Sequence, residues 1–266
     1  MKRISKFLYY GSLLAPVVIL TAGLAVPTTV SAIATTSNYA ATAESPICTN
    51  LSADATKVTT AITTLTGKLT TARQQQDQTL AANRAKEDTA ITANRQKWDT
   101  QRQTNFTKLE AKATTNDQKT AVTTYEAAIT AAVSTRRAAY DSARSTYRAG
   151  VDSDIASQRA QIDSDVNTLT DSVNTAVSTA QASCASDSSV AGGPAIRATF
   201  VASLKSARQT FQSDRKNDTQ IASEVKQLAQ ARDTAFKSAD SAFSSATTAA
   251  QTALKTAFGS QASTIE

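Results

Sequence analysis

The chain has 266 residues, of which 121 are Ala, Thr or Ser, while glycine occurs seven times, proline four times and histidine not at all. Without histidine the commonest general base and metal ligand is missing, and two cysteines cannot form a zinc site. Because turn residues are so few, β-sandwiches, barrels and doubly wound folds are excluded. The composition predicts an all-α, non-enzymatic protein of long helices with no catalytic residues, metal or cofactor.

The N-terminus reads as an export signal. Lys2, Arg3 and Lys6 precede an uncharged stretch at residues 7–26, and Val30-Ser31-Ala32 places small residues where a signal peptidase cleaves. We therefore predict a signal peptide at residues 1–32. An uncleaved anchor is the alternative, because twenty such residues can just span a bilayer. In both cases the body is expected outside the cytoplasm, secreted or at the cell surface.

Removal of the signal changes the charge. The whole chain carries a net charge of +6, but residues 33–266 hold 25 basic and 22 acidic groups. Mixed signs along the helices indicate a solvated surface, so no nucleic-acid partner is expected. We expect a protein partner or self-association, with membrane contact only through the signal segment or weakly at the surface. Residues 33–46 are predicted to be a flexible spacer, and residues 259–266 a short tail.

Apolar residues in the remaining chain recur every eleven positions. A row without exception is formed by Ile129, Tyr140, Val151, Ile162, Val173 and Cys184. Ala82-Asn83-Arg84 also recurs eleven residues later as Ala93-Asn94-Arg95. Eleven residues in three turns give a nearly straight or slightly right-handed stripe. The pattern predicts long helices packed side by side as a coiled coil with 11-residue repeats.

The two cysteines indicate how these helices fold back. A disulfide between Cys48 and Cys184 is the default in an exported chain, and its Cα atoms must lie within about 7 Å. One continuous helix would separate them by roughly 200 Å. The midpoint falls at Asn116, within a cluster of turn-forming residues. We predict an elongated antiparallel three-helix bundle with helices at about 50–113, 118–184 and 195–258. The alternative keeps the long helices continuous in a parallel dimer, with the cysteines paired between chains.

Charged residues lie on or beside the apolar stripe. They form a candidate polar interaction strip of Arg73, Arg84, Glu87, Arg95, Arg136 and Arg144. The strip either docks an acidic partner or pairs across helices with Glu87, Asp88, Asp152 or Asp154, and we favour pairing. Arg136-Arg137 is interpreted as a surface pair. The aromatic residues at helical spacing, Trp98 among them, are expected in the core.

The layout resembles uncharacterised exported Ala/Thr-rich long-helix proteins of the candidate phyla radiation (Patescibacteria). The resemblance rests on the signal, the Ile47-Cys48 start, the regularly spaced arginines, Arg136-Arg137-Ala138-Ala139-Tyr140, Cys184 before a small-residue loop, and Ala207-Arg208-Gln209-Thr210-Phe211. It implies no activity and no site residues. The periplasmic chaperone Skp is also similar in its export and long helices, but the chain has no strand segment for Skp's oligomerising body.

These features together predict an exported structural spacer or protein-interaction rod at the cell envelope or surface. A protein of a different class remains as the alternative. It is an extracytoplasmic holdase chaperone, or a lipid-binding helical protein, that opens its helices to cover apolar surface.

Overall fold

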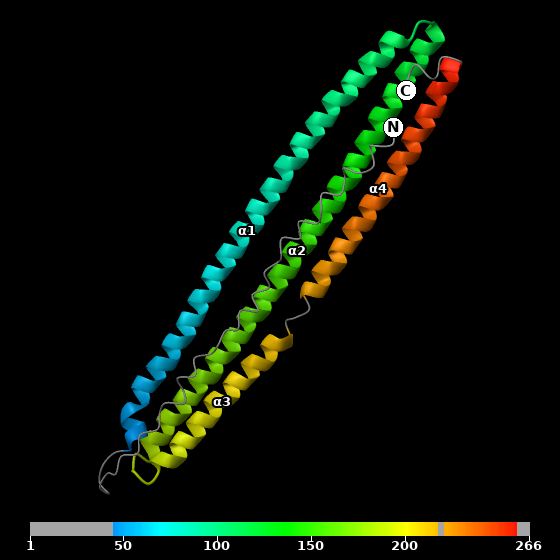
Figure 1. The fold of residues 1–266 in the computed structure, drawn as a ribbon. Helices are drawn as coiled ribbons and strands as arrows, with labels where there is room; N and C mark the ends of the chain where they lie inside the picture. Colours follow the sequence, from blue (N-terminus) through cyan, green and yellow to red (C-terminus); the bar gives the residue numbers. More distant parts are fainter. Residues whose placement is uncertain (1–44, 218–220, 260–266) are drawn as a thin grey trace. The chain divides into compact units, whose positions relative to one another are not determined.

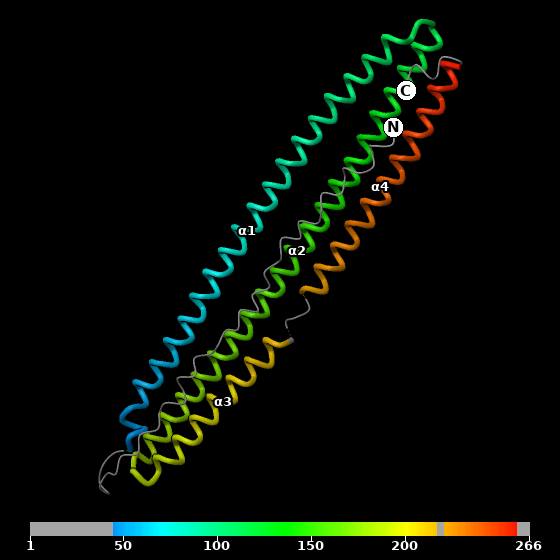
Figure 2. Tube along the Cα trace, in the orientation of Figure 1, coloured from blue at the N-terminus to red at the C-terminus, as the bar shows by residue number. Residues whose placement is uncertain are grey.

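In a computed structural model, the described residues are 45–217 and 221–259, and they form four α-helices. The helices are α1 (Pro46–Lys112), α2 (Asn116–Ser186), α3 (Gly193–Asn217) and α4 (Ile221–Phe258), as Figures 1 and 2 show. The predicted all-α bundle of antiparallel helices is confirmed. The predicted signal peptide, the spacer up to residue 44 and the tail from residue 260 lie outside the described residues.

The observed helix bounds differ from the predicted ones in two places. The first helix begins at Pro46, not near residue 50, so the last residue of the predicted spacer already belongs to α1. The segment predicted as one helix, 195–258, is described as α3 and α4, with residues 218–220 between them outside the described part. At the end of α4, Gly259 has a φ of +51°, the left-handed conformation that commonly ends a helix.

The described residues divide into two compact units that both contain parts of α1 and α2. Unit 1 comprises residues 79–153 and the segment from 223 to 259, so it holds α4. Unit 2 comprises residues 45–78 and 154–222, so it holds α3. In Figure 1, α3 lies beside the C-terminal half of α2 and α4 beside its N-terminal half. Each unit is therefore a three-helix bundle of its own.

The reversal between α1 and α2 is built by a capping box. Thr115 is the N-cap of α2, and its Oγ1 accepts a hydrogen bond from the backbone N–H of Gln118 at 3.2 Å. In return the Gln118 Oε1 accepts from the backbone N–H of Thr115, and also from that of Thr114. This reciprocal pattern satisfies N–H groups that a helix start would leave unpaired. The turn predicted around Asn116 is confirmed, and the buried Gln118 fixes it.

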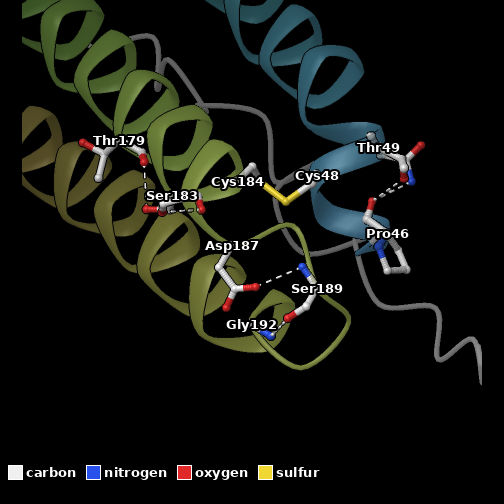
Figure 3. The surroundings of a disulfide bond; sticks show 11 residues. Pro46, Cys48, Thr49, Thr179, Ser183, Cys184, Asp187, Ser189 and Gly192 are labelled. Atoms are coloured by element: carbon white, nitrogen blue, oxygen red, sulfur yellow. Dashed lines mark hydrogen bonds between the residues drawn. A yellow bond between two sulfur atoms is a disulfide. The ribbon is translucent and has the colours of Figure 1, made fainter. Parts of the chain in front are cut away.

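A disulfide joins the start of α1 to the end of α2 in unit 2. Cys48 in α1 and Cys184 in α2 are bonded, with Cα atoms 5.6 Å apart, as Figure 3 shows. The predicted bond is thus confirmed within one chain. Ser45 lies beside it, almost fully buried, and donates its backbone N–H to the carbonyl of Ser188. A Cβ added to Gly193 would collide with the Ser45 hydroxyl, so this contact requires glycine.

Unit 2 has the larger apolar core. Its buried residues come from all three of its helices and include Leu65 and Leu69 of α1, Ile162, Leu169 and Val173 of α2, and Phe200, Leu204 and Phe211 of α3. Phe200 is among the most deeply buried side chains of the described residues. Burial of such side chains stabilises this unit by the usual hydrophobic mechanism.

Two small apolar clusters are described in unit 1. One joins Ala113 and Val122 to Leu254 and Phe258, and another joins Phe106 to Ile129 and Ala250. Between residues 81 and 100, α1 has no buried residue. This stretch must be held on its neighbour by something other than apolar packing.

The many threonines are compatible with these helices because their hydroxyls bond back to the helix itself. Thr63, Thr89 and Thr123, for example, each donate to the carbonyl four residues earlier at 2.9–3.1 Å. The hydroxyl is thereby satisfied without a partner on another helix. Within the described residues, none of the helices has an apolar stretch sufficient to span a bilayer.

Candidate functional site: the arginine–aspartate ladder

Six arginine–aspartate ion pairs connect α1 to α2, and we call them the ladder. They are Arg73–Asp163 and Asp77–Arg159 in unit 2, and Arg84–Asp152, Asp88–Arg148, Arg95–Asp141 and Asp99–Arg137 in unit 1. Each helix contributes the same motif, an arginine followed four residues later by an aspartate, repeated three times at eleven-residue intervals. Residues four apart share a helix face, so both charges of each motif point at the facing helix.

Every pair in the ladder is bidentate. The two terminal nitrogens of each arginine donate to the two oxygens of one aspartate, at distances of 2.6–3.2 Å. The second nitrogen of Arg73, Arg84 and Arg137 also donates to a backbone carbonyl of the facing helix at 3.2–3.4 Å. This fork geometry adds direction to the attraction between charges.

The ladder fixes the register of the two helices. Residue 73 faces 163, residue 84 faces 152 and residue 95 faces 141, so one step of eleven on α1 matches one step of eleven back on α2. This is antiparallel pairing. A shift of four residues would bring arginine beside arginine in one direction, or aspartate beside aspartate in the other, which is unfavourable. The ladder therefore supplies the specificity that repetitive Ala/Thr-rich helices lack.

Arginines lower the pKa of four aspartates of the ladder, Asp77, Asp88, Asp99 and Asp141, and so favour their charged form. The hydrogen bond from Arg159 lowers the pKa of Asp77, and that from Arg148 lowers the pKa of Asp88. Arg137 acts on the pKa of Asp99 in the same way. The aspartates are 40–57% exposed and the arginines 21–31%. Each pair is thus partly screened by water and contributes about 0.2–1 kcal/mol to stability. The main effect of the six pairs together is to fix the register of the two helices.

Glu87 and Arg144 extend the ladder in unit 1. Glu87 accepts from Arg144 at 3.1 Å and from Arg148 at 2.7 Å, and Arg144 also contacts Asp141. Arg144, Arg148 and Asp141, together with Asp88 and Asp152 of the ladder, line a hollow over α2. Because each of them is already paired with a neighbour, the hollow presents no uncompensated charge to a ligand.

The ladder ends at a pair of like charges. The next step of eleven from Asp99 is Glu110, and the next from Arg137 is Glu126, where an arginine would continue the pattern. Burial, reinforced by Glu110, raises the pKa of Glu126. One of its carboxylate oxygens is buried without a hydrogen-bond partner. This rung opposes the closure that the other rungs favour.

Arginines also join α2 to α4 within unit 1, where they stack on aromatic rings. Tyr140 and Phe236 stack with centroids 4.1 Å apart. Arg136 lies over Tyr140 and over Phe243, and Arg232 lies over Tyr147. Asp240 of α4 accepts from Arg136 at 2.6 Å and from the hydroxyl of Tyr140 at 2.8 Å. Such cation–π contacts add to the apolar packing of α2 against α4.

The structure places the six residues of the predicted polar strip in two interfaces. Arg73, Arg84, Glu87, Arg95 and Arg144 lie between α1 and α2, while Arg136 faces α4. The strip is therefore paired rather than open. The expected acceptors Glu87, Asp88 and Asp152 are found, but among the described residues Asp154 pairs with no arginine and has one buried oxygen without a partner.

Two other expectations are wrong. Arg136-Arg137 is not a surface pair, since consecutive helical residues diverge by about 100° and the two arginines reach α4 and α1 respectively. Trp98 is not in the core but 50% exposed, because α1 contacts α2 through charged side chains in this stretch.

Four of the ladder's aspartates, Asp77, Asp99, Asp141 and Asp163, were not anticipated as acceptors, nor was Arg148 as a donor. The signal was present in the sequence as the arginine–aspartate motif on both helices. It becomes visible only when charges are counted in elevens together with the apolar residues. Within the described residues, no group of three or more Cys, Asp or Glu side chains could hold a metal ion.

Comparison of this chain with protein-family models, with curated proteins and with solved structures finds no match. The site must therefore be interpreted from its own geometry. The disulfide indicates an oxidising environment outside the cytoplasm.

Proposed function

We propose that this chain is an exported, non-enzymatic helical protein that acts as a structural spacer or protein-interaction rod at the cell envelope or surface. The observation that carries this proposal is the ladder. Its charged groups pair with one another and hold α1 and α2 in one register. Such pairing maintains a fixed geometry between the two helices. The N-terminal signal sequence and the disulfide support a location outside the cytoplasm.

The exposed surface supports the same proposal. Among the described residues, Trp98 is the one large hydrophobic side chain that is exposed. A holdase chaperone or a lipid-binding helix needs a broad apolar face, which is available here only if the helices separate. The ladder and the disulfide both oppose such separation, and we infer that the helices stay together during function. A protein partner or a second copy would then bind the outer helix faces.

The proposal is tested by the suppression of client aggregation. The oxidised protein is added at equimolar ratio to a thermally aggregating client enzyme, and light scattering is followed. A spacer or rod leaves the scattering unchanged. The same protein with Cys48→Ser and Cys184→Ser serves as a matched variant that lacks the disulfide. Suppression by the oxidised protein would contradict the rod and favour the holdase.

A further inference from the structure

We propose that the outer face of α1 in unit 1 binds a linear polymer of phosphate groups that carries no bases. The proposal starts from a motif that the ladder does not explain. Three times at eleven-residue spacing, an asparagine is followed three residues later by a lysine: Asn83 and Lys86, Asn94 and Lys97, Asn105 and Lys108. The two residues of each pair share one helix face.

The geometry of the helix places these pairs away from α2. Lys86 and Lys97 each follow a ladder arginine by two residues, which is a rotation of about 200° around the helix. All three lysines and all three asparagines are exposed. Successive pairs are about 16 Å apart along the axis and nearly in line. We call this set of six residues the Asn–Lys row.

The charge of the Asn–Lys row is not compensated within the described residues. No ion pair is formed by Lys86, Lys97 or Lys108, and no acidic residue lies three or four positions from any of them. Lys57, by contrast, pairs with Asp54 three residues away at 2.9 Å. The acidic residues Glu87, Asp88 and Asp99 of the same stretch are occupied by α2.

The asparagines have no structural reason to recur. Asn83 and Asn94 make no hydrogen bond to other described residues, and Asn105 only accepts one from Gln101. Asparagine is also a poorer helix former than the alanine that is so common in this chain. Three exposed amide donors, each beside an ammonium group, instead match the way proteins contact phosphate oxygens.

The chemistry of the row favours a linear, base-free polymer. Binding groups arranged in a line along a single helix fit an extended polymer chain better than a flat membrane surface. The face between the lysines carries alanine, threonine, asparagine and glutamine, with no bulky apolar side chain to insert into a bilayer. Trp98 borders the row, since it lies four residues after Asn94 and about 100° around the helix from Lys97. It is the one exposed aromatic ring among the described residues, whereas single-stranded nucleic acid is bound through a series of rings on which successive bases stack.

This inference deepens the proposed function and rests on it, because a spacer at the envelope needs a means of retention there. Phosphate polymers exposed in the envelope would provide repeated anchoring points. Each contact is weak by itself, and the repeat makes several contacts possible at once.

The test measures the affinity of the oxidised protein for long-chain inorganic polyphosphate at low salt, by calorimetry and by the emission of the single Trp98. The triple variant Lys86→Gln, Lys97→Gln and Lys108→Gln is expected to lose about 100-fold in affinity, or about fivefold per lysine. The slope of log K against log salt should become shallower by about two.

Matched variants separate the row from general charge. Lys205→Gln, Lys226→Gln and Lys237→Gln together remove the same charge from exposed sites of α3 and α4 and should change affinity less than about threefold. Asn83→Ala, Asn94→Ala and Asn105→Ala should weaken binding without altering the salt slope. Circular dichroism confirms that all variants remain helical.

Several results would overturn the proposal. One is an equal loss of polyphosphate affinity in the two triple lysine variants. Another is that single-stranded DNA, polyglutamate or phosphatidylglycerol vesicles bind through the same three lysines as tightly as polyphosphate does. The proposed function would fail on a different readout, namely client aggregation. A rod that shows no polyphosphate binding would therefore contradict this inference alone.

Discussion

Reversal of one charge in the ladder should destabilise unit 1 in a measurable and rescuable way. Arg148 is the best position, because its side chain is only 21% exposed and contacts two acids, Asp88 at 2.8 Å and Glu87 at 2.7 Å. In Arg148→Glu both attractions are lost and two repulsions replace them. With about 0.5–1 kcal/mol for each of these four partly screened interactions, we expect a loss of about 2–4 kcal/mol.

The rescue distinguishes the ladder from simple loss of packing. Asp88→Arg added to Arg148→Glu restores an arginine–carboxylate pair with the direction exchanged, and should recover about half of the lost free energy of unfolding. Lys205→Glu reverses an exposed charge for which no pair is seen in the described residues, so it should change stability by less than about 0.5 kcal/mol.

Urea unfolding followed by circular dichroism at several salt concentrations measures these effects. The penalty of Arg148→Glu should shrink in 1 M salt, where the screening length is about 3 Å. The reasoning is refuted if Arg148→Glu unfolds like Lys205→Glu, or if the added Asp88→Arg makes the protein still less stable. Either result would mean that the observed pairs do not couple α1 to α2.

The remaining predictions concern the disulfide, the carboxyl groups of Glu126 and of the ladder, and the contact between Ser45 and Gly193. Reduction of Cys48–Cys184, which are separated by 136 positions, or replacement of both by serine should cost about 5 kcal/mol of unfolding free energy in guanidinium titrations, less if the unfolded chain keeps structure. Unchanged stability would show that the bond closes no entropically costly loop. The pKa of Glu126 is raised, so its charged form weakens the fold above the pKa of the unfolded state, and Glu126→Gln should raise the melting temperature at pH 7 but not at pH 3. The pKa values of Asp77, Asp88 and Asp99 are lowered, so their contribution is present above about pH 4 and is lost as pH falls further; a melting temperature that stays constant down to pH 2 would contradict this. Gly193→Ala places a methyl group against Ser45 and should lower the free energy of unfolding by about 1–3 kcal/mol. Gly67 has open space around it, so Gly67→Ala should stabilise the helix. Equal effects of the two substitutions would refute the contact between Gly193 and Ser45.

Much of the fold could be predicted because local rules and long-range constraints agreed. The cysteines required a reversal near Asn116, and the residues there supplied a capping box, so the turn followed from two independent features. Eleven-residue apolar rows indicated long straight helices on the same grounds. The end of α3 at Asn217 and the start of α4 at Ile221 were not predicted, because no cysteine pair required a boundary there to support the turn-forming residues at 217–219.

The candidate site was predicted only in part. Arg73, Arg84 and Arg95 stood out because they interrupt an apolar stripe, and pairing across helices was the favoured interpretation. Asp152 was named as an acceptor, but Asp141 and Asp163 were not, because aspartates on an exposed helix face look the same whether they meet solvent or an arginine. Trp98 was misplaced for a related reason, since periodicity identifies the inner stripe of a helix but not whether a neighbour is close enough to bury it.

The central claim is that α1 and α2 of a single chain pair in the register set by the ladder. We would test it by replacing Arg84 and Asp152 with cysteines in the oxidised protein and treating it with a short bis-maleimide linker, followed by intact mass and peptide mapping. The pair Arg84→Cys and Asp141→Cys, displaced by eleven residues or about 16 Å, is the control. We expect a cross-linked monomer for the first pair and unlinked, singly modified cysteines for the second. A covalent dimer, or equal cross-linking of both pairs, would contradict the account.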